Sequence, residues 1–111
     1  HTVRVNNPLC GDRVNLEARI EDGVVQAIRH KTRGCALCVA SASVVCEAAE
    51  GHPTDGLRDR AAAVLLALSP TAPDDAPLSD PALTLFRAVT SAPARRGCVA
   101  LPWTAISKIL P

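Results

Sequence analysis

The chain has 111 residues, enough for one compact domain with its own core and too few for two. Its twelve Lys and Arg residues nearly balance eleven Asp and Glu residues, so the chain lacks the charge excess that attracts nucleic acid or anionic membranes. Its longest apolar run, residues 61–68, is far shorter than the roughly 20 residues that span a bilayer. We therefore expect neither a nucleic-acid partner nor a membrane partner.

The first third of the chain shows the alternation of a β-sheet. Residues 14–20 alternate strictly between apolar and polar side chains, which is typical of a half-buried antiparallel strand. Asp22-Gly23 follows, a pair typical of two-residue hairpin turns, and a second strand is expected over residues 24–31. The β-branched residues within 2–5 predict a short strand ahead of these two. Together they predict a small antiparallel three-stranded sheet.

The pattern changes to that of a helix after Gly34. The stretch "CALCVASASVVCEAAEG" has small and apolar residues at helical spacing, and Gly51 is a plausible stop signal. Cys35 is therefore expected at or just before a helix N-terminus. A second helix is expected over residues 58–68, with Thr54 or Asp55 as its cap and Ser69-Pro70 as its end.

The last third of the chain alternates between proline-rich loops and helices. The loop "SPTAPDDAPLSDP" is followed by a short predicted helix over residues 82–89, a second loop "TSAPARRG", and a last helix over about 99–110. Pro102 is tolerable in that helix only within its first turn. Strands first and helices afterwards predict an α+β fold, with the helices packed on one face of the sheet.

The cysteines favour a reduced compartment. There are five of them, an odd number, in a chain with no visible secretion signal, and this fits a disulfide framework poorly. We expect reduced thiols, some of them bound to metal or reactive, and a cytoplasmic protein.

Three of the thiols lie at predicted connections. Cys10 lies in a turn, Cys35 at a strand-to-helix junction and Cys98 at the start of the last helix, where helix N-terminal N–H groups favour a thiolate. Three thiolates leave a tetrahedral ion one ligand short, and Asp12 has a carboxylate to offer. Their spacing does not match a zinc finger, so the residues alone leave open a four-ligand metal site or separate buried thiols.

Three blocks of the sequence, "NNPLCGD", "KTRGCALCVASASVVCE" and "ARRGCVALPWTAI", resemble the iron–sulfur cluster assembly family of IscU, SufU and the NifU N-terminal domain. The resemblance implies one such domain over residues 1–111, with the α+β fold described above. It places the family's metal ligands on Cys10, Asp12, Cys35 and Cys98, where family members hold zinc or a [2Fe–2S] cluster. The family also carries a helix ahead of the C-G-D strand. This chain lacks it, so the sequence is expected to begin inside the domain.

The branch that the chain resembles most is SufU. The long proline-rich insertion between Cys35 and Cys98 is SufU-like, the chaperone-docking motif of IscU is absent, and Arg95 matches an arginine of SufU-type proteins. The segment "KTRGC" is more similar to the IscU and NifU sequences. The SufU resemblance implies a zinc-dependent sulfurtransferase that takes persulfide sulfur from a SufS-like cysteine desulfurase onto Cys10. An IscU-type scaffold would assemble a [2Fe–2S] cluster for downstream proteins, and its acceptor would be Cys98.

Several other residues have both a functional and a structural interpretation. Cys38 forms C-x-x-C with Cys35 but is expected to be a small buried side chain, and Cys46 is expected to fill the core. His30 is expected to be solvated or hydrogen-bonded rather than a metal ligand. The structural interpretation of Arg95 and Arg96 is a solvated pair in a polar loop, and the functional one is that they orient a partner. Trp103 is expected to anchor the last helix.

Overall fold

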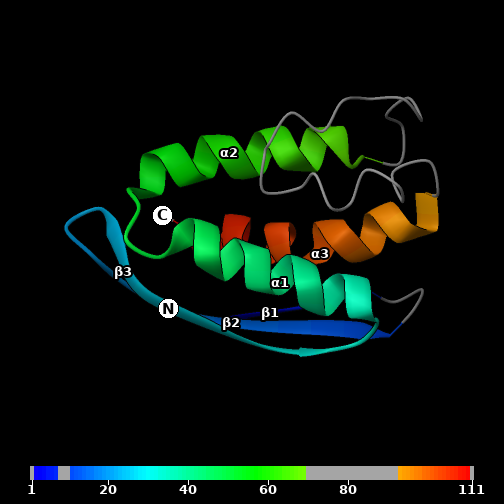
Figure 1. Cartoon of the computed structure of the whole chain (residues 1–111). Helices are drawn as coiled ribbons and strands as arrows, with labels where there is room; N and C mark the ends of the chain where they lie inside the picture. The colour runs from blue at the N-terminus through cyan, green and yellow to red at the C-terminus, as the bar shows by residue number, and fades with distance from the viewer. Residues whose placement is uncertain (1, 8–10, 70–92, 111) are drawn as a thin grey trace.

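The computed structural model describes residues 2–7, 11–69 and 93–110 of the chain. In chain order it contains β1 (Thr2–Asn7), β2 (Asp12–Glu21), β3 (Val24–Arg33), α1 (Ala36–Ala49), α2 (Thr54–Ala67) and α3 (Pro93–Ile109) (Figure 1). Cys10 and the short helix predicted over residues 82–89 lie outside the described residues.

The strands form one antiparallel sheet in the order β1-β2-β3. The alternation of residues 14–20 is reproduced in β2, where Val14, Leu16 and Ala18 are buried while their neighbours face outward. Asp22 and Gly23 both adopt positive φ, 55° and 72°, as the predicted two-residue hairpin turn requires. Local sequence therefore sets the hairpin turn, while a register shift between Arg19 and Ile20 offsets the rest of the β2-β3 pairing by one residue.

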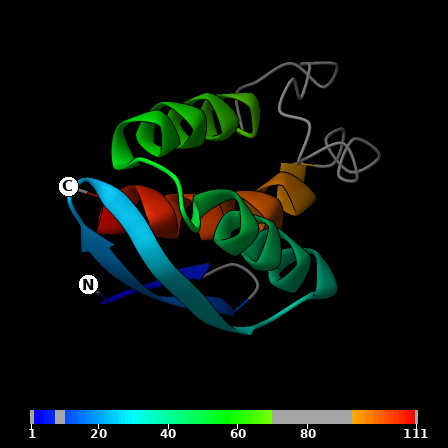
Figure 2. The same ribbon diagram turned by 60° about the vertical axis from the view of Figure 1, so that its left-hand side comes forward.

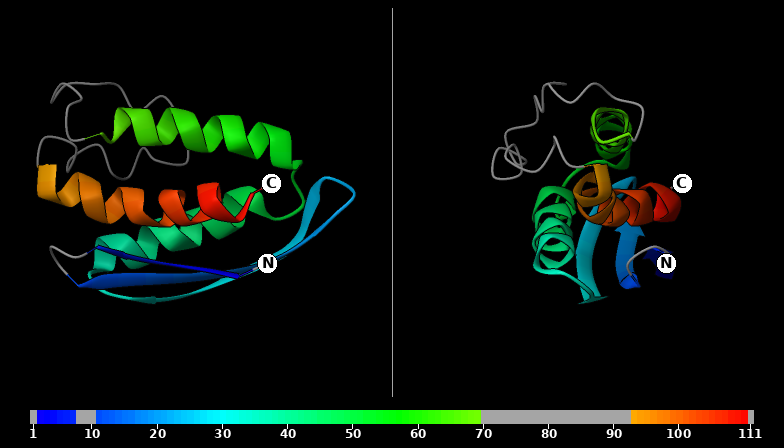
Figure 3. Two further views of the ribbon diagram at one scale, coloured as in Figure 1. Left: turned by 180° about the vertical axis from the view of Figure 1, so that it is seen from behind. Right: turned by 90° about the vertical axis from the view of Figure 1, so that its right-hand side faces the viewer.

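The helices cover one face of the sheet in two layers. α1 and α3 lie directly on the sheet, and α2 lies over them on the side away from it (Figure 1, Figure 3). Figure 2 shows the same layering from another side. The predicted α+β class and the placement of the helices are confirmed. None of the helices among residues 2–7, 11–69 and 93–110 is long and apolar enough to cross a membrane.

The core fills the space between the layers. Trp103 is fully buried, as expected of an anchor for α3. Large aliphatic side chains surround it, and each contributes about 1.5–3 kcal/mol on burial. The core includes Val14, Leu16, Val25, Val45, Leu57, Val64, Val99 and Ile106.

The start of α3 differs from the prediction. The helix begins at Pro93, so all of the "ARRG" expected in a loop is helical and Pro102 lies well inside the helix. Proline at the first helical position is favourable because its missing N–H would have no partner there. Pro102 has no N–H to offer the Cys98 carbonyl, yet the helix continues because its buried face packs on α1 and the sheet. Tertiary packing thus overrides the local signals.

The start of α2 also differs from the prediction. The helix begins at Thr54, its N-cap is Pro53, and neither predicted cap residue holds that position. The Thr54 N–H donates instead to the Gly23 carbonyl at 2.8 Å. A helix N–H that would otherwise need a capping side chain is thus satisfied by the hairpin.

Candidate metal centre

Three polar side chains from three separate segments meet at the end of the sheet where β2 begins and β3 ends. Asp12 is the first residue of β2, Cys35 joins β3 to α1, and Cys98 lies in α3. One ligand atom from each lies within 4.8 Å of the other two. Asp12 is 2% exposed and Cys98 is 6% exposed, while Cys35 is partly exposed. The structure therefore brings together three of the four predicted ligands.

The Asp12 carboxylate is fixed against Cys35 by both of its oxygens. Oδ1 accepts the Cys35 backbone N–H at 3.1 Å, and the Cys35 thiol donates to Oδ2 at 3.6 Å. Cys35 is the N-cap of α1, and its side chain makes no capping hydrogen bond to that helix. The predicted helix N-terminus at Cys35 is confirmed. An anionic group at this end of α1 is favourable because the helix dipole is positive there.

Gly34 gives the Asp12 carboxylate the space it occupies. A Cβ at position 34 would lie 2.2 Å from Asp12 Oδ1 and 2.6 Å from Asp12 Cγ, both well inside van der Waals contact. Sequence reasoning treated Gly34 only as the end of the sheet region and missed this role. A glycine directly before Cys35 could have indicated a close approach of another group. Its partner Asp12 could not be identified, because it lies far away in the sequence.

Cys98 is held by the packing of α3 on α1. The fully buried Ser41 hydroxyl of α1 donates to the carbonyl of Val99, the next residue of α3, at 2.6 Å. The prediction that Cys98 lies at a helix N-terminus is wrong, because α3 begins at Pro93. Ser41 was not singled out from the sequence. Its signal was a polar side chain on the buried face of a small-residue helix.

The donor set suits a zinc ion. Thiolates and a carboxylate are common zinc ligands, and tetrahedral zinc holds such atoms about 3.5–3.8 Å apart at its usual bond lengths. The atoms of Asp12, Cys35 and Cys98 lie within 4.8 Å of one another, so small side-chain rotations would bring them to that spacing. The three groups therefore fit three of the four positions of a zinc site.

Two other candidates take structural positions. His30 Nδ1 lies 2.8 Å from the Thr32 hydroxyl and Nε2 lies 3.2 Å from the Ser43 hydroxyl, so its ring links β3 to α1. The hydrogen-bonded interpretation of His30 is confirmed. Cys38 is fully buried, as predicted.

The remaining candidates are Cys46, Arg95 and Arg96. Cys46 is half-buried against the core, and burial, with a smaller effect of the Glu50 charge, raises the pKa of its thiol to about 11. The structural interpretation of Arg96 is wrong, because Arg96 is 2% exposed and donates to the Ser69 carbonyl just beyond α2 at 3.1 Å. The Arg95 side chain lies outside the described part of the structure, although its backbone belongs to α3.

Comparisons with known sequences identify relatives of two kinds. SufU of Bacillus subtilis (strain 168), named a zinc-dependent sulfurtransferase, is 29% identical over 107 residues, which cover 96% of this chain and 71% of SufU. The iron–sulfur cluster assembly scaffold protein IscU of Escherichia coli (strain K12) is 38% identical over 52 residues, which cover 46% of this chain and 41% of IscU.

Solved structures show the same fold. A nitrogen-fixing NifU-like protein (N-terminal) from Brucella abortus superposes with a TM-score of 0.82 at 29% identity, covering 97% of this chain and 74% of that one. A SufU from Fervidobacterium islandicum AW-1, described as a putative scaffold, superposes with a TM-score of 0.75 at 24% identity, covering 98% and 78%, which shows the fold alone. The family model for the NifU-like N terminal domain matches residues 1–99. The chain therefore belongs to the NifU-like N-terminal domain family.

Proposed function

We propose that this chain is a zinc-dependent sulfurtransferase of the SufU type, which accepts persulfide sulfur from a cysteine desulfurase in iron–sulfur cluster biogenesis. The observation that carries the proposal is the convergence of Asp12, Cys35 and Cys98 from three segments into one largely buried group. Similarity to SufU along 96% of the chain supports this choice, and it supports treating residues 1–111 as one functional domain.

The residues proposed to hold the zinc ion are Cys10, Asp12, Cys35 and Cys98. Bound zinc would keep thiols ionised at neutral pH while still exchanging ligands readily. Asp12 and Cys35 are already oriented toward each other by two hydrogen bonds. The burial of Asp12 and Cys98 limits the access of water to this group.

We assign the sulfur-accepting step to Cys10. Its thiolate attacks the terminal sulfur of the desulfurase persulfide, so a new sulfur–sulfur bond forms on Cys10. The old sulfur–sulfur bond breaks, and the desulfurase cysteine leaves as a thiolate. Arg95, three residues before Cys98, is proposed to support the site by offsetting its negative charge or orienting the partner. The desulfurase is proposed to be SufS-like and the setting cytoplasmic.

A second candidate function is a scaffold on which a [2Fe–2S] cluster is assembled and passed to downstream proteins. The observation that favours it is the 38% identity to IscU over 52 residues, higher than the overall identity to SufU. The same cysteines would then hold iron, and Cys98 would replace Cys10 as the sulfur acceptor.

Metal content and desulfurase turnover separate these functions. Anaerobically purified chain is expected to contain close to one zinc per molecule and to stimulate a SufS-like desulfurase. Cys10→Ala should abolish the stimulation, whereas the matched variant Cys46→Ala should retain it because Cys46 lies outside the Asp12, Cys35 and Cys98 group. Normal stimulation by Cys10→Ala would rule out the assigned acceptor. A stable coloured cluster that transfers to an apo-protein would instead support the scaffold.

A further inference from the structure

We propose that Cys35 and Cys38 form a reversible disulfide that withdraws Cys35 from the metal centre. The two cysteines are the C-x-x-C pair at the start of α1, where Cys35 is the N-cap and Cys38 is the third helical residue. The disulfide itself stands on this local geometry, whereas its effect on metal binding rests on the zinc site of the proposed function.

The backbone places the two cysteines within bridging range. The Val39 N–H donates to the Cys35 carbonyl at 3.2 Å, so the first turn of α1 is already formed around the pair. The N-cap and the third helical position are the two that a capping box joins, so a side chain at the extended Cys35 can reach position 38. A disulfide needs Cα atoms about 4.4–6.8 Å apart and Cβ atoms about 3.5–4.5 Å apart, so a bridge here requires the two Cβ atoms to be drawn to that distance.

The Cys35 thiol can leave its present partner by a side-chain rotation. Its Sγ donates to Asp12 Oδ2 at the long distance of 3.6 Å and makes no capping hydrogen bond that would hold it. Rotation about χ1 between staggered positions moves Sγ around the Cα–Cβ bond without moving the backbone. The hydrogen bond from the Cys35 N–H to Asp12 can remain while the thiol turns.

The unequal burial of the two thiols sets the order of reaction. Cys35 is partly exposed and Cys38 is fully buried, so a small-molecule disulfide reaches Cys35 first. Cys35 attacks one sulfur of that oxidant, forms a mixed disulfide and releases one thiol. Cys38 then attacks the Cys35 sulfur, which forms the internal disulfide and releases the second thiol. Both protein thiols are oxidised, and the oxidant is reduced to two thiols that carry away the protons.

Oxidation of this pair would leave the metal centre incomplete. A sulfur in a disulfide cannot act as a thiolate ligand, so the proposed site would keep Cys10, Asp12 and Cys98 but lose Cys35. Zinc binding and disulfide formation therefore compete for the same Cys35 sulfur. Reduction of the disulfide would return Cys35 to the site.

The test uses the full chain, stripped of metal with a chelator and treated anaerobically with glutathione disulfide. Free thiols are then alkylated, and the disulfides are mapped by peptide mass spectrometry. We expect a Cys35–Cys38 crosslink that a reductant removes, and a loss of zinc binding while it is present. Zinc-loaded chain should form the crosslink at least about tenfold more slowly, because bound Cys35 is withheld from exchange.

Two matched variants complete the test. Cys38→Ser should stop at the glutathione adduct on Cys35, and Cys46→Ser should form the crosslink like the unmodified chain. A crosslink of Cys35 to a cysteine other than Cys38, or no internal crosslink in the metal-free chain, would overturn the proposal. Absence of the crosslink in a chain that binds zinc and stimulates the desulfurase would overturn this inference alone. A crosslink in a chain that does neither would overturn only the proposed function.

Discussion

The two ends of the sheet are closed by different kinds of contact. At the end where β2 turns into β3, the connection between α1 and α2 is joined to the hairpin by backbone hydrogen bonds of 2.7–3.0 Å. At the opposite end, side chains close the structure, with the Asp12 carboxylate between Cys35 and Cys98. Backbone closure depends little on residue type, whereas side-chain closure depends on particular residues. We therefore expect the metal chemistry at the Asp12 end.

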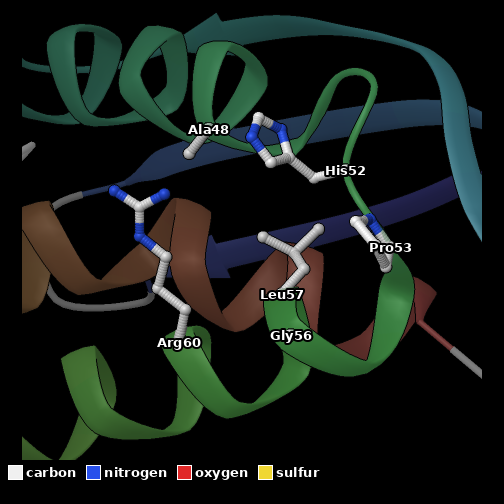
Figure 4. Close-up of a pocket in the computed structure, with 6 residues that line it drawn as sticks. All are labelled: Ala48, His52, Pro53, Gly56, Leu57 and Arg60. Atoms are coloured by element: carbon white, nitrogen blue, oxygen red, sulfur yellow. The ribbon is translucent and has the colours of Figure 1, made fainter.

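A hollow lies at the backbone-closed end and reinforces this difference. It has a volume of about 160 Å³ and lies between α1 and the start of α2 (Figure 4). Its lining has no thiol and no carboxylate, and the imidazole of His52 alone does not make a set of metal ligands. At the Asp12 end the donors already lie together. The lining residues are Ala48, His52, Pro53, Gly56, Leu57 and Arg60.

Removing the Asp12 charge should impair zinc binding most. Asp12→Asn keeps an oxygen that can accept the Cys35 N–H but loses the anionic ligand. We expect the zinc affinity to fall by about 100-fold or more, the upper end of the range for groups supporting a metal. Competition with a chromophoric chelator measures this.

The matched control for Asp12 is Glu17→Gln on the same strand. Glu17 pairs with Arg29 at the surface, where such pairs contribute less than about 1 kcal/mol. The zinc affinity of the Glu17→Gln variant should equal that of the unmodified chain. Equal affinities in both variants would mean that Asp12 is not a ligand.

Replacing one glycine by alanine at each end of the sheet tests the two kinds of closure separately. Gly34→Ala forces its Cβ against Asp12 and should lower the zinc affinity by about 10–100-fold, because it displaces a ligand without removing it. Gly51→Ala, at the other end, meets no atom within 4 Å and carries only the penalty of positive φ, about 1–2 kcal/mol.

Chelator competition and urea unfolding separate the two glycine effects. Gly51→Ala should lower the free energy of unfolding while binding zinc normally. If Gly34→Ala bound zinc as tightly as Gly51→Ala, then the close approach of Gly34 to Asp12 would have no role in the site.

The contrast between the ends also explains which features could be predicted from the sequence. Asp22-Gly23 and the alternation of β2 are local signals, so the hairpin turn and the buried face of β2 could be predicted. Cys35 at a helix start could be predicted for the same reason. The contact between Gly34 and Asp12 could not, because it depends on which residues β2 and β3 bring together in space.

The predicted starts of α2 and α3 were wrong, because tertiary contacts replace the usual local signals at both. α2 begins at Thr54 with its first N–H donated to the Gly23 carbonyl, and no side chain caps it. α3 begins at Pro93, and Arg96 in its first turns is buried against the Ser69 carbonyl. A cation at the end of α2 is stabilised by the negative pole of that helix. Neither contact leaves a pattern in the neighbouring sequence.

A smaller effect is expected from the contact that fixes α3 on α1. Ser41→Ala removes the hydroxyl that donates to the Val99 carbonyl and should lower the free energy of unfolding by about 1 kcal/mol. Ser43→Ala, on the exposed side of the same helix, removes only the solvent-exposed contact with His30 and should change it by less than about 0.5 kcal/mol. Urea unfolding of the metal-free variants measures both. Equal stability of the two variants would show that the buried hydroxyl contributes nothing to the position of α3.

The smallest effect concerns Cys46, a thiol of α1 outside the Asp12, Cys35 and Cys98 group. Burial, with the Glu50 charge as a lesser cause, raises its pKa from 9.0 to about 11, so the folded chain keeps this proton more tightly than the unfolded chain. Its contribution to stability is complete below pH 9.0 and is lost as the pH rises to about 11. Because solvent screens a half-buried thiol, we expect a fall of less than about 1 kcal/mol. Urea unfolding of Cys46→Ala should show a flatter decline over this range, and an identical decline would assign the titration to other groups.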